Sequence, residues 1–162
     1  MDRHWHLVQA NSAVAPLLAG VSADLLAGVP NVLRLSLHPD GLAPRIRNLR
    51  DWRNHVFLRL ARQIEATADP VLSALLAELR GYGVPAGARP PSPRPQIWGS
   101  FAFTLELNTR DNVPLSFLTA TTVFGTATDA WLSELAIETF FPADAATQAY
   151  LALASPSSAA RI

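Results

Sequence analysis

"SFAFTLELNTRDNVPLSFLTATTVFG", residues 100–125, is the stretch in which the spacing of apolar residues changes from helical to strand-like. In its first part, large apolar residues alternate with smaller or polar ones. One face of this strand therefore carries Phe101, Phe103, Leu105 and Leu107. The turn "TRDN" leads to a second strand in "VPLSFLTATTVFG", and "SELAIETFF" predicts a third. Short connections between consecutive strands predict an antiparallel meander with one covered face.

Helical patterns precede and follow these strands. The longest helix is predicted from about Pro44 to Ala66, with an apolar face at Ile46, Leu49, Trp52, Val56, Leu60 and Ile64. Asn31 and Asp69 are expected to cap two further helices, in "VLRLSLH" and "PVLSALLAELR". Short helices are expected within 12–20 and 22–29, a strand at 4–10 and a closing helix at 142–154.

The predicted fold class is α+β, with an antiparallel sheet and helices packed on one of its faces. An order of strand, helices and three-stranded meander is that of PAS-like sensor domains. The 162 residues form one domain by size, and the proline-rich stretch 84–95 is expected to be a loop inside it. Residues 155–162 are expected to be a disordered tail.

Composition excludes several kinds of function. The chain contains no cysteine and no lysine, which rules out a thiol nucleophile, cysteine-based metal sites and Schiff-base chemistry. It has no long apolar run and no apolar signal segment, so a cytoplasmic protein without membrane contact is expected. The formal net charge is zero, whereas a domain that binds DNA by itself is normally basic.

Two groups of polar residues could form binding sites, but each is also explained by an ordinary structural role on the surface. His4 and His6 share one face of the expected strand and could bind a metal with His38 or His55, but solvated histidines are the favoured interpretation. Neither a metal nor a cofactor is therefore predicted. A second group could contact nucleic acid, although a solvated helix face paired with the acidic strands is favoured: Arg45, Arg47, Arg50, Arg53, Arg59 and Arg62.

Three charged residues in apolar segments, Arg34, Glu106 and Glu138, are candidates for catalysis or ligand recognition. Arg34 lies between two leucines and is expected to pair with Asp40 or Glu106, or to hold a ligand carboxylate. Glu106 and Glu138, placed on adjacent strands, are explained as outward-facing side chains. With no Gly-x-Ser-x-Gly motif either, no active site is identified and the chain is predicted not to be an enzyme.

Three segments resemble one known family: "HWHLVQANSAVAPLL", "NVLRLSLHPDGLAPRIRNLRDWRNHVFLRLARQ" and the meander "FAFTLELNTRDNVPLSFLTATTVFGTATDAWLSELAIETFFPAD". Together they are similar to the C-terminal ligand-binding domain of MmyB-like, Xre-family helix-turn-helix transcription regulators. The likeness covers residues 4–154. Its most specific parts are "NVLR" at 31–34 and "HPDG" at 38–41, which occur in the family's order and spacing.

The resemblance implies a bacterial, PAS-like domain that binds a small hydrophobic, fatty-acid-like effector. It implies DNA contact only through an N-terminal helix-turn-helix domain, which is absent from this chain, and a homodimer is a further expectation. The family would have made its first sheet strand before the point where this chain starts. The residues expected to line an apolar pocket are Trp5, Arg34, Trp52, Val56, Phe57, Phe101, Phe103 and Phe117. The alternative is a dimerisation or protein-interaction module with a filled core and no ligand.

Overall fold

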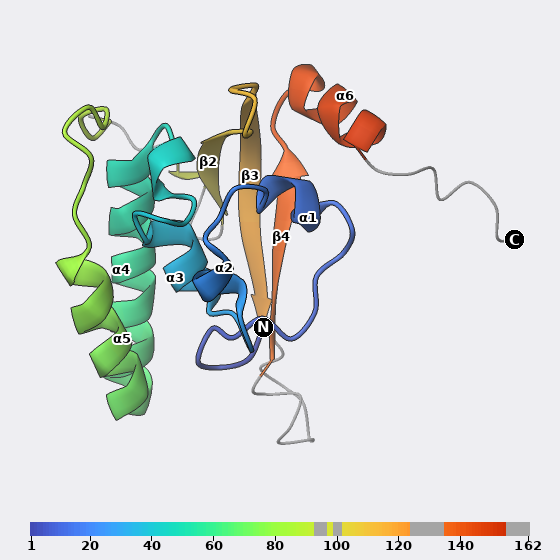
Figure 1. Cartoon of the computed structure of the whole chain (residues 1–162). Helices are drawn as coiled ribbons and strands as arrows, with labels where there is room; N and C mark the ends of the chain where they lie inside the picture. The colour runs from blue at the N-terminus through green and yellow to red at the C-terminus, as the bar shows by residue number, and fades with distance from the viewer. Residues whose placement is uncertain (93–96, 99–101, 124–134, 155–162) are drawn as a thin grey trace, which may run out of the picture.

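Seven helical segments, six α-helices and one 3₁₀ helix, are seen in the computed structural model, which describes residues 1–92, 97–98, 102–123 and 135–154 (Figure 1). The predicted tail, 155–162, lies outside the described residues. The helical elements are α1 (Val14–Leu17), α2 (Ala23–Leu26), α3 (Val32–Leu37), a 3₁₀ helix (Ala43–Arg45), α4 (Leu49–Thr67), α5 (Pro70–Gly81) and α6 (Ala145–Ala154). No helix of this part of the chain has the length and apolar character needed to cross a bilayer.

The sheet has the order β1-β2-β3-β4, and every neighbouring pair is antiparallel. Its strands are β1 (Ile97–Trp98), β2 (Ala102–Asn108), β3 (Pro114–Val123) and β4 (Ala136–Pro142). The predicted meander of three strands is confirmed, and the short β1, which was not predicted, adds a fourth strand beside β2. The fold is therefore α+β, and its arrangement is compatible with a PAS-like topology.

The core lies between one face of the sheet and α3, α4 and α5, which Figure 1 shows on the same side of the sheet. Register pairs Phe103 with Thr119 and Leu105 with Phe117, so these four side chains share the covered face. Leu60 of α4 and Leu79 of α5 are fully buried in the same core cluster as Phe103, Leu105 and Phe117. The alternation read from the sequence thus selects the correct face of β2.

The helix caps predicted at Asn31 and Asp69 are both confirmed. The Asn31 side-chain oxygen accepts hydrogen bonds from the N–H groups of Leu33 and Arg34 at the start of α3. The Asp69 carboxylate accepts one from the N–H of Val71 at the start of α5. Each cap satisfies helix donors that have no partner within the helix.

The predicted strand at 4–10 is wrong, because residues 2–6 fold into a tight loop that we call the N-terminal hook. The backbone N–H of Asp2 donates to the carbonyl of His6, and the N–H of Trp5 donates back to the carbonyl of Asp2. The Asp2 carboxylate accepts hydrogen bonds from the N–H groups of His4 and His6. Trp5 itself has a φ of 69°, a left-handed conformation that is incompatible with a strand.

Helix α4 begins at Leu49, not near Pro44 as predicted, because Asn48 binds the edge of β2. Its side-chain amide donates to the carbonyl of Thr104 (2.7 Å) and accepts from the N–H of Glu106 (3.0 Å). The N–H of Arg47 donates to the carbonyl of Glu106, and Ile46 forms a β-bridge with Leu107. This segment is therefore extended, and the helix starts only after it.

Candidate functional site

The main candidate site is a cleft of about 440 Å³ between the start of α4, the edge of β2 and the segment 89–92. We call it the α4–β2 cleft. Its lining residues come from three separate parts of the sequence: Asn48, Asp51, Arg89, Pro90, Pro91, Ser92, Phe103, Thr104 and Glu106. The cleft thus opens at the boundary between the helical layer and the sheet, where ligand sites commonly form.

Hydrogen bonds and an ion pair hold the segment 89–92 over this cleft. Both carboxylate oxygens of Asp51 accept from the N–H of Ser92 at 3.1 Å. Nη1 of Arg89 lies 3.1 Å from Oε2 of Glu106, and the Arg89 side chain is half exposed. Because the pair of Arg89 and Glu106 is partly exposed, it contributes little to stability by itself.

Phe103, the aromatic residue that lines the cleft, belongs to a cluster of three rings. The ring of Phe103 stacks on His55 with a centroid distance of 4.5 Å, and both rings contact Trp52, at 5.9 and 5.6 Å. The indole N–H of Trp52 donates to Oγ of Ser36, so this ring is fixed in the core. Phe103 therefore offers apolar ring surface beside the polar residues of the cleft, and the other two rings support it.

His55, which the sequence analysis did not place near this site, stacks on Phe103 but is not among the residues that line the cleft. Burial, with smaller contributions from Arg59 and Arg62, lowers its pKa from 6.5 to about 4. The ring is therefore neutral at neutral pH and presents a largely apolar surface. Its position three residues after Trp52 on the same helix was the available signal.

We expect the low pKa of His55 to make stability depend on pH. Between pH 6.5 and about 4 the unfolded chain binds a proton at His55 that the folded chain does not, so the free energy of unfolding falls as pH falls. Between pH 7.5 and 5 the loss should be about 1.5 kcal/mol, allowing for partial solvent screening. Urea unfolding across this range should show this loss relative to His55→Gln; identical profiles would contradict it.

Most of the predicted pocket residues lie in the core, and only one of them lines the α4–β2 cleft. Trp5, Trp52, Val56, Phe103 and Phe117 belong to the buried cluster, and Phe57 is half buried against it. Phe103 reaches the cleft, while Trp52 supports it from behind. Phe101 lies outside the described residues.

Arg34 lies in a second cleft, of about 380 Å³, between the N-terminal hook, α3 and α5. Its predicted pairing with Asp40 or Glu106 is wrong. Nε and Nη2 of Arg34 instead donate to the two carboxylate oxygens of Glu78 on α5, at 2.8 and 2.7 Å. The Tyr82 hydroxyl also donates to Glu78. The pairing follows from the packing of α5 beside α3, which no local pattern in the sequence reveals.

The arginines of the α4 region are only partly a solvated face paired with acidic strands. Arg59 pairs with Glu138 of β4 at 2.9 Å, and Arg47 lies 3.9 Å from Glu106, as that interpretation predicts. Arg53 departs from it, because its side chain is buried, lies over the Phe57 ring and donates to the carbonyl of Tyr82.

The interpretation of the two strand glutamates as outward-facing neighbours also needs correction. β3 separates their strands, so Glu106 and Glu138 do not lie side by side. Glu138 points to the helical side, where its Oε2 accepts from Arg59 and from the hydroxyl of Thr121. It is therefore part of the contact between helices and sheet.

Comparison with known proteins identifies one family. The family of the MmyB-like transcription regulator ligand binding domain matches residues 1–154, which confirms the resemblance found in the sequence. No curated protein and no solved structure gives a significant match. The family is one of regulator ligand-binding domains and not a family of enzymes.

Proposed function

Because the chain belongs to the family of MmyB-like transcription regulator ligand-binding domains, we propose that it senses a small hydrophobic, fatty-acid-like effector. The α4–β2 cleft is the proposed entry site. In this proposal the domain acts in a cytoplasmic regulator, and DNA is bound only through a helix-turn-helix domain that these residues do not form. The chemistry of the proposal is binding, without catalysis.

The observation that carries the proposal is the ring of Phe103, which lines the cleft and is held in place by stacking on His55. A phenyl ring favours an alkyl chain, since contact with it removes apolar surface from water. At the rim, the half-exposed guanidinium of Arg89 can exchange its contact with Glu106 for the carboxylate of the effector. The cleft therefore matches a molecule with an apolar tail and an acidic head.

Helix α4 provides the route by which occupancy of the cleft would be transmitted. Asn48, which directly precedes it, and Asp51 of its first turn lie at the cleft, and its later turns contact the N-terminal hook. There the guanidinium of Arg59 lies 4.4 Å from the Trp5 ring, and Gln63 accepts from the Trp5 indole N–H at 2.9 Å. An effector that favours one packing of α4 on the sheet would shift the hook between two populations.

We expect a fluorescent fatty acid to bind the purified chain and Phe103→Ala to weaken binding at least about tenfold, because a buried aromatic contact is lost. Equilibrium fluorescence titration measures both affinities. Phe141→Ala is the matched control, since Phe141 is a half-exposed phenylalanine of β4. Phe103→Leu keeps the core filled and should give an intermediate loss. Equal affinities of the wild type, Phe103→Ala and Phe141→Ala would contradict the proposed site.

Exposed apolar side chains on β4 favour a second candidate function, dimerisation or protein interaction through the sheet. Ile137 is 52% exposed and Phe141 51%, and the register places both on the face opposite the one that carries Phe117. Exposed apolar patches of this kind often mark contacts with another protein. If this alternative holds, Phe141→Asp changes the molar mass in solution while fatty acids do not bind.

A further inference from the structure

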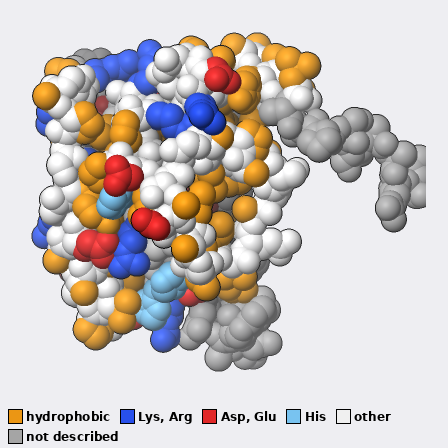
Figure 2. All heavy atoms as spheres, in the orientation of Figure 1, with side chains coloured by type: hydrophobic (Ala, Val, Ile, Leu, Met, Phe, Trp, Pro, Cys, Tyr) orange, Lys and Arg blue, Asp and Glu red, His pale blue; other side chains and the backbone are white. Residues whose placement is uncertain are grey.

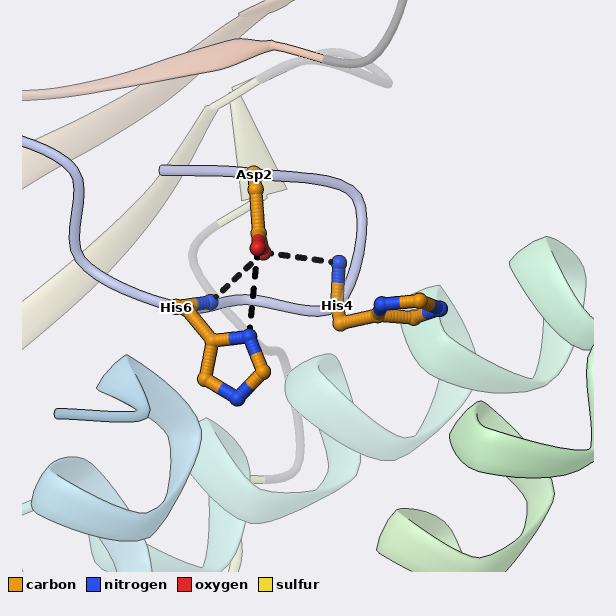
Figure 3. Close-up of side chains that lie close together, drawn as sticks. All are labelled: Asp2, His4 and His6. Atoms are coloured by element: carbon orange, nitrogen blue, oxygen red, sulfur yellow. Dashed lines mark hydrogen bonds and ion pairs between the residues drawn. The ribbon is translucent and has the colours of Figure 1, made fainter. Parts of the chain in front are cut away.

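The N-terminal hook brings together three side chains of the types that bind transition metals. Asp2, His4 and His6 each offer one ligand atom, and these atoms all lie within 4.8 Å of one another. Figure 3 shows the Asp2 carboxylate and the His6 ring facing each other, while the His4 ring projects to the side, away from them. On the space-filling surface, histidine side chains form a patch over the N-terminal segment (Figure 2).

This group of three residues differs from the metal site weighed in the sequence, in which His38 or His55 would join His4 and His6. His38 packs against Tyr82 and His55 stacks on Phe103, so neither joins His4 and His6. The third residue is Asp2, which the turn of the hook brings back to the two histidines. Two imidazoles and one carboxylate are a donor set that suits zinc and its divalent neighbours.

A contact outside this set orients one of the histidines. Nε2 of His4 lies 2.8 Å from Oδ2 of Asp69, at the start of α5, so its other ring nitrogen, Nδ1, remains for an ion. Histidine ligands of metals usually make such a hydrogen bond to a carboxylate, which fixes the tautomer and the ring. In addition, the side chain of Asn31 donates to the carbonyl of His4 at 2.8 Å, which holds the backbone of the hook.

The three side chains are accessible to an ion and need only small movements to bind it. Side-chain exposure is 21% for His4, 35% for His6 and 36% for Asp2. Nδ1 of His6 already lies 3.1 Å from Oδ2 of Asp2, close to the separation of two ligand atoms bound to one zinc ion. An ion would replace this hydrogen bond, and water would complete its coordination.

We propose that Asp2, His4 and His6 bind one divalent transition-metal ion, with zinc as its chemical type, and that Asp69 positions His4. The site is separate from the α4–β2 cleft. A bound ion would fasten the hook to the start of α5 through the contact between His4 and Asp69. Trp5 connects the hook to α4, so a bound ion would also rigidify the segment that contacts α4.

Isothermal titration of untagged, EDTA-stripped protein with Zn²⁺ tests the proposal. We expect one ion per chain and a rise of the melting temperature with Zn²⁺ concentration. Asp2→Asn keeps an oxygen for the backbone N–H groups of the hook but removes the carboxylate, and should weaken binding at least about tenfold. Asp69→Asn should weaken binding about 10- to 100-fold while leaving one ion per chain.

His38→Ala is the matched control, because His38 also lies near an aspartate, 3.8 Å from Asp40, but outside the hook. It should bind Zn²⁺ as the wild type does. His6→Gln, whose folding is checked by circular dichroism, provides a second variant if Asp2→Asn is unstable. Absence of Zn²⁺ binding, or binding that Asp2→Asn and His6→Gln leave unchanged, overturns the proposal.

Discussion

Replacing Asn48 by alanine is expected to lower the free energy of unfolding by about 3 kcal/mol. Asn48 is 8% exposed, and its amide makes two hydrogen bonds to the backbone of β2, one as donor and one as acceptor. Alanine removes both and leaves the N–H of Glu106 without its acceptor in a half-buried position. Loss of a buried partner costs more than the net strength of the hydrogen bond itself.

Urea unfolding of Asn48→Ala and Asn54→Ala measures this effect. Asn54 lies on the exposed side of α4. Its replacement by alanine therefore makes the same chemical change without removing a contact to β2. Asn54→Ala should change stability by less than about 0.5 kcal/mol. Asn48→Asp keeps the acceptor but loses the donor, and should lie between the two. Equal midpoints for Asn48→Ala and Asn54→Ala would show that the start of α4 is held by other contacts.

Replacing Arg59 by methionine is the second substitution with a large expected effect, a loss of about 2 kcal/mol. Its Nη1 lies 2.9 Å from Oε2 of Glu138, and its guanidinium covers the Trp5 ring. The other carboxylate oxygen of Glu138 is buried and has no hydrogen-bond partner among the residues that the structure describes. Without Arg59 a half-buried carboxylate would lose its cation, and the partial exposure of the pair moderates the loss.

A double-mutant cycle with Glu138→Met separates the pair from simple packing. The double variant should recover part of the stability that Arg59→Met loses, because no uncompensated charge then remains. Arg62→Met, an exposed arginine one turn away, is the control and should be nearly neutral. Additive losses in the cycle would mean that Arg59 acts through its contact with Trp5 alone.

The sequence predicts those parts of the fold that local chemistry determines. Alternation gave the covered face of β2, and the side chains of Asn31 and Asp69 gave the starts of α3 and α5. The "HPDG" turn also has a local reason, since a Cβ on Gly41 would lie 2.4 Å from the carbonyl oxygen of Leu35. Only glycine fits there.

The errors arise where a polar side chain bonds to backbone groups and so overrides the apolar pattern. Asn48 binds β2 across more than fifty residues, which overrides the helical spacing that begins at Pro44. The Asp2 carboxylate satisfies backbone N–H groups of the hook and removes the expected strand. The candidate site has the same origin, because its walls meet only when the segment 89–92 folds over α4. Apolar periodicity finds its buried rings but not its polar rim.

Mapping of chemical shifts with sodium dodecanoate tests the central claim, that a fatty-acid-like molecule enters between α4 and β2. In two-dimensional amide NMR spectra, the largest changes should fall on residues 48–55, on Arg89 and Ser92, and on residues 103–106, with smaller changes in the N-terminal hook. The exposed side of β4 around Phe141 should remain unchanged. Absence of saturable shifts, or shifts confined to β4, would contradict the account.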